Sequence, residues 1–596
     1  MGNNAYDERL HRLQAQLAKD GIRAYVVQVT DPHQTEEAAP RFLEERLALS
    51  AYKGSDGLLL VTPERSLLWA DGRYWVEAEE ELAGTDTELV RMGDHGVPTM
   101  SEFIKEHSLY PLAMDFSTMG VVDFESFSGQ GAGQIVDRSY RDVVCGKMET
   151  PISQIWKVDQ KLLSDTYYDR LMKVCESLKR KGAKATLISS LDDIAYLLGW
   201  RGNDLEFSPL FMSYLYITDE GKADLFVRTD RVPEELPGLT VHDYDQVWNF
   251  LRKANERPVT TLIDPRRTNQ RIMEYVKRPL FATNPSQMQK SIKGPVEIEQ
   301  TKRIHVLDGF AVFRLWQWLD EHIIRGGEAH TEAEIAAVVD GFRYEQPDCY
   351  ALSFPTIAAF RGHAAMMHYL PPKESGSIVS SQGLNPILLV DSGGQYYGGT
   401  TDITRTFCLG QASDEYRHDY TLTLKSVIDL SSSIFMQGCS GIALDIKARE
   451  NMWREGMDYK CGTGHGVGYM LNVHESPNGF RYRLVPERED SAELQPGQIQ
   501  SDEPGVYKAG KYGIRIENEL LTVRINHTSD GIFNAFKNIT FCPMQLDMVD
   551  TSLLSQFEVE RINEYQDLCR DQLLPLCEGK PELRDFLIAK TGHLSK

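Results

Sequence analysis

The sequence predicts a multidomain chain of the α/β and α+β classes, with two N-terminal α/β domains followed by a larger C-terminal domain. Its 596 residues are enough for three or four folding units of about 100–200 residues each. The order helix, glycine, strand occurs twice in the first half of the chain. The segment from 340 to 540 is richer in glycine and in short strand-like runs. These three observations predict the fold class.

The first helix, glycine and strand lie near the amino terminus. Apolar residues at helical spacing from Tyr6 to Leu17 predict a helix that ends at Gly21, and residues 24–29 are predicted to form a buried strand. The same order returns at 171–188, around Gly182. We therefore expect two related α/β domains in this half of the chain.

Breaker residues mark two domain boundaries. Gly146 and Pro151 interrupt the periodic pattern near residue 150, and residues 283–295 do so again through Pro285 and Pro295. We therefore predict three domains, at 1–150, 151–290 and 291–596.

The third domain is predicted to begin and end with helices. Apolar positions from Ile304 to Leu315 predict a helix from Glu297 to about Leu319. Near the end, Leu554, Phe557, Ile562, Tyr565, Leu568 and Cys569 recur at helical spacing. We expect this last helix to pack on the domain, because its other face is densely charged.

The composition excludes several classes of function. The chain has 64 Lys and Arg against 87 Asp and Glu, a net charge of −23, which argues against nucleic acid and against an anionic membrane surface. Its nine cysteines show no regular spacing, which predicts reduced thiols. Residues 1–12 carry no secretory signal, and the longest apolar runs are far shorter than a bilayer span. A cytoplasmic protein is predicted.

The first motif whose residues could carry chemistry runs from Val390 to Asp402. Residues 386–390 are predicted to form a strand with Asp391 at its end, and glycines at 393, 394, 398 and 399 allow the chain to turn back. Asp402 would then lie opposite Asp391, and the two carboxylates would repel each other unless cations bind between them. Solvated turn carboxylates are the ordinary alternative.

Two further motifs follow. In the sequence GTGHGVG, glycines flank His465, and His474 comes nine residues later. Glu503 precedes a predicted hairpin, and Arg515, Glu517 and Glu519 share one face of its second strand. The ordinary alternatives are a hydrogen-bonded core histidine and a strand face that meets water. The other interpretation is that Glu503 and Glu517 point into an interior filled with metal.

Together these motifs form a set of metal ligands. The set has four carboxylates and one imidazole: Asp391, Asp402, His465, Glu503 and Glu517. Two divalent cations would balance the four negative charges and bridge a hydroxide between them, which is a hydrolytic device. Oxygen-rich ligation favours Mn²⁺, with Zn²⁺ or Co²⁺ as alternatives.

In these five residues and their order the chain resembles the three-domain Xaa-Pro aminopeptidases, the aminopeptidase P branch of the creatinase and methionine aminopeptidase superfamily. The similarity extends over nearly the whole chain, with softer matches at 69–74 and 198–204. It implies two creatinase N-like domains, then a pita-bread metallopeptidase domain with a C-terminal helical extension.

The resemblance also implies a role for each site residue. Asp391 would hold one metal, His465 and Glu503 the other, and Asp402 and Glu517 would bridge them. The bridging hydroxide would attack the carbonyl before proline, with Glu503 transferring the proton. His368 and His474 match histidines that contact the substrate and act in catalysis. Arg515 would support Glu517.

The expected substrates are peptides with proline at position 2, and a homodimer is expected from the resemblance alone. Two departures from the family pattern, at Cys461 and His363, leave the substrate preference open. A prolidase that cleaves only Xaa-Pro dipeptides is the near alternative. A catalytically inactive pita-bread module that binds peptides is the alternative from another functional class.

Overall fold

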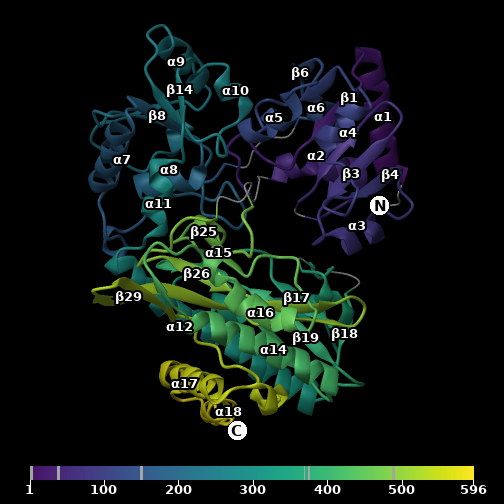
Figure 1. Cartoon of the computed structure of the whole chain (residues 1–596), viewed down its shortest axis with the longest axis vertical. Helices are drawn as coiled ribbons and strands as arrows, with labels where there is room; N and C mark the ends of the chain where they lie inside the picture. Colours follow the sequence, from purple (N-terminus) through teal and green to yellow (C-terminus); the bar gives the residue numbers. More distant parts are fainter. Residues whose placement is uncertain are drawn as a thin grey trace. The chain divides into compact units, whose positions relative to one another are not determined.

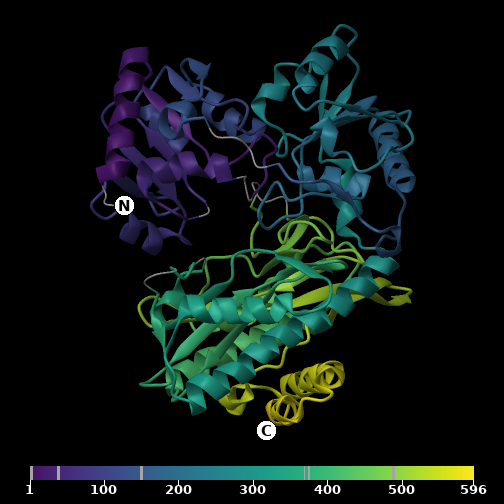
Figure 2. The same ribbon diagram turned by 180° about the vertical axis from the view of Figure 1, so that it is seen from behind.

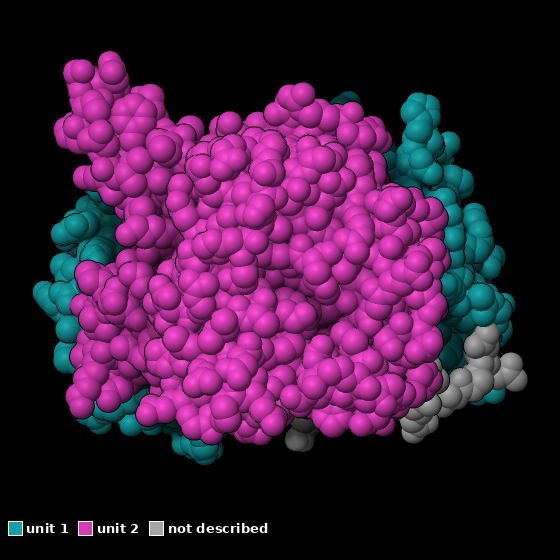
Figure 3. Space-filling model, turned by 90° about the horizontal axis from the view of Figure 1, so that it is seen from below, with its two compact units in different colours: residues 1–158, 165–289 teal, residues 159–164, 290–596 magenta. Residues whose placement is uncertain are grey.

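The chain folds into two compact units in the computed structural model. The structure describes residues 4–36, 40–54, 56–147, 152–367, 369–372, 376–485 and 490–596. The first unit contains residues 1–158 and 165–289, and the second contains residues 159–164 and 290–596 (Figure 3). Each unit is described by itself below.

The first unit contains two six-stranded sheets with the same topology. The sheet nearer the amino terminus has the order β4-β3-β2-β1-β5-β6, and the other has the order β12-β11-β10-β8-β13-β14. In each, the third and fourth strands of that order pair antiparallel, and the two strands at the far end pair parallel. The repeat predicted from the sequence is therefore present at the level of the whole sheet.

The strands and helices of the two sheets have these bounds. The first contains α1 (Asn4–Asp20), β1 (Ala24–Val27), α2 (Pro40–Ser50), β2 (Leu58–Val61), β3 (Ser66–Ala70), α3 (Trp75–Glu81), β4 (Thr87–Arg91), α4 (Met100–Glu106), β5 (Leu112–Met114), α5 (Val121–Ser128), β6 (Ile135–Asp137) and α6 (Arg141–Cys145). The second contains α7 (Tyr167–Lys181), β8 (Ala185–Ile188), α8 (Leu191–Leu198), β10 (Tyr214–Thr218), β11 (Ala223–Phe226), β12 (Leu239–His242), α9 (Gln246–Ala254), β13 (Thr261–Ile263), α10 (Gln270–Met273) and β14 (Pro279–Phe281).

The sequence explains why α7 leads into β8. Thr166 caps the start of α7 by accepting the N–H of Asp169, and Gly182 ends the helix with a φ of 73° in the left-handed region. Val174 and Leu178 are fully buried on the inner face. All four residues of β8, the strand predicted at 185–188, are buried.

The second unit has strands backed by long helices (Figures 1 and 2). Its helices are α11 (Pro285–Ser291), of which the last two residues belong to this unit, α12 (Pro295–Trp318), α13 (Glu332–Tyr344), α14 (Asp414–Ser431), α15 (Gly441–Leu444), α16 (Ile446–Arg454), α17 (Gln556–Leu573) and α18 (Pro581–Lys590). Helix α12 continues beyond Trp318 as a π-helix over Leu319–Arg325. A core cluster joins α12 and α13 to the strands through Phe313, Trp316, Val339, Leu388 and Val390.

The strands of this unit form two sheets that matter for the site. One has the order β17-β19-β22 and the other β23-β30-β29-β26-β24-β25, with a separate hairpin β27–β28. Their bounds are β17 (Ile357–Phe360), β19 (Ile387–Ser392), β22 (Ile403–Cys408), β23 (Ile434–Met436), β24 (Gly464–Gly466), β25 (Glu475–Phe480), β26 (Ile499–Asp502), β27 (Gly505–Lys508), β28 (Tyr512–Arg515), β29 (Asn518–Thr528) and β30 (Gly531–Asn538). A small third sheet, β16-β20-β21, contains β16 (Cys349–Leu352), β20 (Gly394–Tyr396) and β21 (Gly399–Thr400).

The C-terminal helix packs on the unit as predicted. Ile562, Tyr565 and Cys569 of α17 are buried in a cluster with α14 and β28. Phe557 and Leu568, which the sequence places on the same stripe, are 51% and 36% exposed. Among the described residues, no helix is both long and apolar enough to cross a bilayer.

Candidate metal centre

Asp391 lies within β19, at the centre of its three-stranded sheet. Its register partners are Ile357 on β17 and Thr404 on β22. The sequence-based expectation that Asp402 would face Asp391 is therefore displaced by two residues, because β22 begins at Ile403. The two aspartates still lie at neighbouring positions of one sheet end. Asp391 is 8% exposed, and its Oδ1 atom has no hydrogen-bond partner in the described chain.

Asp402 and Glu517 lie just outside strands. The backbone N–H of Glu517 donates to the Thr404 carbonyl oxygen (3.1 Å), and the Thr404 hydroxyl donates to Oε2 of Glu517 (2.7 Å). Oε1 of Glu517 is buried without a hydrogen-bond partner among the described residues. The residues Arg515, Glu517 and Glu519 are at most 4% exposed, so the alternative that this face meets water is wrong.

His465 is held on β24 by two main-chain contacts. Its backbone N–H donates to the Ser501 hydroxyl (3.0 Å), and its Nδ1 lies 2.9 Å from the Gly466 carbonyl oxygen. Because a carbonyl only accepts, Nδ1 carries the hydrogen and Nε2 is left as an electron-pair donor. The flanking glycines are required sterically. A Cβ atom at Gly464 would lie 1.9 Å from the Ser501 carbonyl oxygen.

Glu503 follows β26 and lies close to the same imidazole. Its backbone N–H donates to the Thr463 carbonyl oxygen (2.8 Å), and its Oε1 lies 3.4 Å from Nε2 of His465. The Ser501 hydroxyl donates to Oε1 as well (3.2 Å). Its side chain is 20% exposed, against 16% for the His465 side chain, so Glu503 is accessible to a bound molecule.

Arg515, at the end of β28, is the cation of this site. Its guanidinium donates to Oδ2 of Asp391, to the Thr404 hydroxyl (3.1 Å) and to the Tyr507 hydroxyl (2.8 Å). The predicted hairpin that carries it is present, with Gly510 at φ 71° in the turn. Its second strand ends at Arg515, so the prediction that Glu517 and Glu519 share this strand is wrong: Glu517 lies beyond it and Glu519 on β29. Arg515 thus contacts Asp391 directly, whereas its support of Glu517 passes through Thr404.

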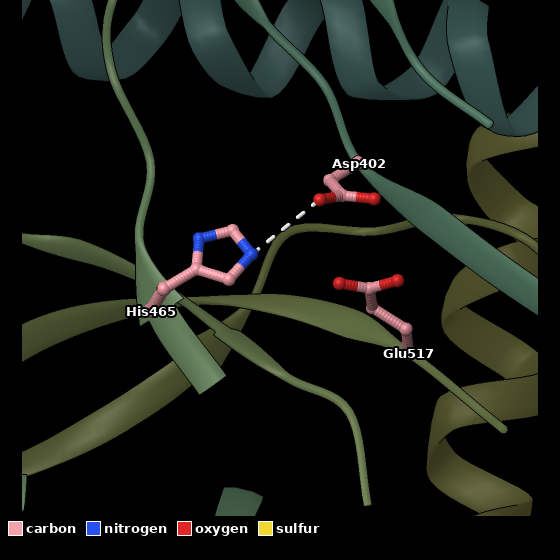
Figure 4. A group of neighbouring side chains, drawn as sticks. All are labelled: Asp402, His465 and Glu517. Atoms are coloured by element: carbon pink, nitrogen blue, oxygen red, sulfur yellow. Dashed lines mark ion pairs between the residues drawn. The ribbon is translucent and has the colours of Figure 1, made fainter. Parts of the chain in front are cut away.

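The site concentrates negative charge in a buried place. Ligand atoms of Asp402, His465 and Glu517 all lie within 4.8 Å of one another (Figure 4), and Nε2 of His465 is 3.6 Å from Oδ2 of Asp402. Burial and the carboxylates of Asp391 and Glu503 raise the pKa of Asp402 well above its usual range. Burial and the carboxylates of Asp402, Glu503 and Asp391 raise the pKa of Glu517 well above its usual range.

This donor set fits divalent metal ions. Oxygens of Asp402 and Glu517 converge with a nitrogen of His465, and one buried oxygen each of Asp391 and Glu517 has no hydrogen-bond partner among the described residues. Metal ions would add positive charge to that of Arg515, which lies among several carboxylates.

The other predicted residues have different surroundings. The ring of His474 meets that of His465 edge to face, with centroids 4.3 Å apart. His368 lies outside the described residues. Cys461 packs beside Tyr459 and Val506, and burial raises the pKa of its thiol to about 11. Nδ1 of His363 lies 2.9 Å from the buried carboxylate of Glu332.

Four further residues shape the site but were not selected from the sequence. Thr404 and Ser501 supply hydroxyl groups that bind the main chain or the side chains of the cluster. Glu519 accepts the backbone N–H of Asp402 (2.8 Å), and His305 of α12 lies against Glu519. In the sequence, only the alternation of Arg515, Glu517 and Glu519 pointed to Glu519 as a residue of the site. No sequence pattern pointed to His305.

Segments of the chain match models of known protein families. Residues 299–524 match Metallopeptidase family M24, and residues 532–594 match the C-terminal region of that peptidase family. Residues 9–140 and 147–297 each match the Creatinase/Prolidase N-terminal domain. The predicted fold class is thus confirmed, with two creatinase-type domains followed by a pita-bread metallopeptidase domain.

Similar proteins match almost the whole chain. Xaa-Pro aminopeptidase 1 of Dictyostelium discoideum is 32% identical over 97% of this chain and 95% of its own length. Aminopeptidase P2 of Arabidopsis thaliana is 32% identical over 99% of this chain and 89% of its own length. The crystal structure of the X-prolyl aminopeptidase of Caenorhabditis elegans, a cytosolic enzyme with a di-nuclear active site, superposes with a TM-score of 0.92. It is 28% identical and covers 98% of this chain and 99% of its own.

Proposed function

Because this chain belongs to the Xaa-Pro aminopeptidases of Metallopeptidase family M24, we propose that it releases the first residue from peptides whose second residue is proline. One observation carries the proposal: ligand atoms of Asp402, His465 and Glu517 converge within 4.8 Å in the M24 part of the chain. The chain is accordingly a hydrolase.

We propose two divalent ions as cofactors, with Mn²⁺ as the first choice and Zn²⁺ or Co²⁺ as alternatives. The di-nuclear site of the C. elegans relative supports the number of ions. Asp391 would hold one ion, His465 and Glu503 the other, and Asp402 and Glu517 both. When bound, the ions would lower the pKa of a water molecule and polarise the carbonyl group before proline.

The remaining chemistry belongs to the side chains. Glu503 is the most exposed carboxylate of the set, so we propose that it accepts a proton from the attacking water and delivers it to the proline nitrogen. His474 is proposed to donate a hydrogen bond to the substrate carbonyl, and His368 is proposed for the same task from its sequence position alone. Arg515 orients Asp391 through its guanidinium.

The proposal also covers the domain boundaries, the location in the cell and the oligomeric state. The three domains are proposed at 1–150, 151–290 and 291–596. A cytoplasmic location is supported by the cytosolic C. elegans relative, and a homodimer is proposed from family resemblance. Light scattering of the purified chain, with a monomer mass of 67.6 kDa, tests the dimer.

Peptide hydrolysis tests the function. Metal-stripped protein is given Arg-Pro-Pro or the dipeptide Arg-Pro, with and without Mn²⁺, and free arginine is measured. We expect Mn²⁺-dependent release from the tripeptide and loss of that release in Asp402→Ala. Cleavage of the dipeptide alone would identify a prolidase, and cleavage of neither would favour a peptide-binding module.

A further inference from the structure

A buried ion pair lies directly behind the proposed metal ligands. Glu519 and His305 are both 0% exposed, and Oε2 of Glu519 lies 2.8 Å from Nε2 of His305. On the other side of the imidazole, Nδ1 lies 2.7 Å from the Thr301 carbonyl oxygen of α12. Because a carbonyl only accepts, Nδ1 carries a hydrogen, and the second ring nitrogen faces a carboxylate. The imidazole is therefore hydrogen-bonded at Nδ1 and lies at ion-pair distance from Glu519 at Nε2.

The second carboxylate oxygen of Glu519 acts on Asp402. Oε1 accepts the backbone N–H of Asp402 at 2.8 Å. Asp402 precedes the first residue of β22, so this N–H is not part of a strand ladder. Within the described residues, Glu519 supplies its acceptor. The conformation of the main chain at Asp402 thus depends on a side chain from β29.

Glu519 has a counterpart on the neighbouring strand. Ser501 on β26 is the register partner of Glu519 on β29. The Ser501 hydroxyl accepts the backbone N–H of His465, as Glu519 accepts that of Asp402. Two facing residues of one strand pair therefore hold the main chain of two proposed metal ligands.

We propose that Glu519, anchored by His305, is a positioning residue that sets the place of the Asp402 carboxylate for metal binding. The inference rests on the proposed function. Burying a charged pair is costly, and here the pair reaches from a helix to the main chain of a ligand. Groups that orient metal ligands in this way commonly change metal affinity about 10–100-fold when altered.

Two variants test separately whether the length or the charge of the Glu519 side chain matters. Glu519→Gln keeps the length, so its amide oxygen still accepts from Asp402 and its NH₂ group faces His305 in the neutral form. Glu519→Asp keeps the charge but is one methylene group shorter, so it cannot reach Asp402 and His305 together. The proposal therefore expects Gln to preserve the site and Asp to damage it.

The experiment measures metal binding without any peptide. Mn²⁺ binding to the metal-stripped full chain is followed by calorimetry, and exchange of the Asp402 amide is followed by hydrogen–deuterium exchange before metal is added. Glu558 of α17 is the matched control, because it is also buried, accepts the Ser555 N–H and pairs with a cation, Lys425. Circular dichroism verifies that each variant is folded.

We expect Glu519→Asp to weaken Mn²⁺ binding about 10–100-fold and to expose the Asp402 amide to exchange. Glu519→Gln should leave both close to the unmodified chain, and Glu558→Asp should not change metal binding. The inference, but not the proposed function, would be overturned if Glu519→Asp kept the Mn²⁺ affinity and the Asp402 amide protection of the unmodified chain. Loss of Mn²⁺ affinity in Glu519→Gln but not in Glu519→Asp would overturn it as well. Failure of the unmodified chain to bind Mn²⁺ would overturn the proposed function and this inference with it.

Discussion

In the absence of metal, Glu517→Gln is expected to stabilise the second unit. Glu517 and Asp402 are buried, and their ligand atoms lie within 4.8 Å of each other. Burial and the carboxylates of Asp402, Glu503 and Asp391 raise the pKa of Glu517, and the Arg515 cation offsets them in part. Glutamine has nearly the same shape, and its amide oxygen can still accept the hydroxyl hydrogen of Thr404. The substitution therefore removes a charge and keeps the packing.

The size of the effect follows from the separation of the charges. The ligand atoms of Glu517 and Asp402 lie no more than 4.8 Å apart, and at that distance and an effective dielectric constant of about 20 two like charges repel by about 3.5 kcal/mol. Proton uptake by the raised-pKa carboxyls relieves part of this, so we expect the free energy of unfolding to rise by about 1–3 kcal/mol at pH 8. A folded-state pKa above the unfolded value means that stability is lost as pH rises. The advantage of Glu517→Gln should therefore grow from pH 5 to pH 8.

Thermal unfolding of EDTA-treated protein measures this difference. A change of 1 kcal/mol corresponds to roughly 2 °C in a domain of this size, so the variant should melt about 2–6 °C higher. With excess Mn²⁺ the order should reverse, because the unmodified chain binds the ions more tightly and ligand binding stabilises. Glu558→Gln, which breaks an ion pair with Lys425, should be destabilised in both conditions. A metal-free Glu517→Gln protein that melts at or below the unmodified one would refute the reasoning.

Three more outcomes are expected. Arg515→Met should lower kcat/KM for Arg-Pro-Pro by at least about 100-fold, because the charged partner of Asp391 is lost. Unchanged steady-state kinetics would contradict the role of Arg515 in orienting Asp391. Burial lowers the pKa of His33, whose Nδ1 lies 2.9 Å from the Ser189 carbonyl oxygen. The unfolded chain therefore binds a proton more readily, so the chain should unfold at lower urea concentration as pH falls from 7.5 to 5.5. His33→Gln should reduce this pH dependence, and an unchanged pH dependence in the variant would contradict the reasoning. Because burial raises the pKa of Cys461 to about 11, the native chain should leave this thiol unmodified by iodoacetamide at pH 8, as mass spectrometry of the alkylated peptide would report.

Much of the fold follows from local patterns in the sequence. The strand at 185–188 and the long helix, observed as Pro295–Trp318, were predicted nearly to the residue because their apolar period and their glycine or proline boundaries agree. The hairpin around Gly510 was predicted for the same reason. The π-helical extension at Leu319–Arg325 was not, because no sequence signal distinguishes it from a continuing α-helix.

The site was less predictable in its long-range contacts. The motifs pointed to Asp402, His465 and Glu517, whose ligand atoms do converge. The pairing of Asp391 with Thr404 depends on where β22 starts, which glycine spacing does not determine. The contact of His305 with Glu519 joins residues 214 positions apart through tertiary packing alone. Such contacts have no local signature, so sequence patterns cannot reveal them.

The strand order of the second unit has a consequence for how the enzyme is made. The proposed ligands come from β19, β24 and the ends flanking β22, β26 and β29, so the first and last of them are separated by more than a hundred residues of chain. Contacts of such large sequence separation form late in folding, since long loops must close before they are made. A growing chain in which Glu517 has not yet been synthesised lacks one of the proposed ligands, so we expect metal ions to have no complete site on it. The proposed metal ions would therefore bind the second unit only after residues 391–517 have folded together.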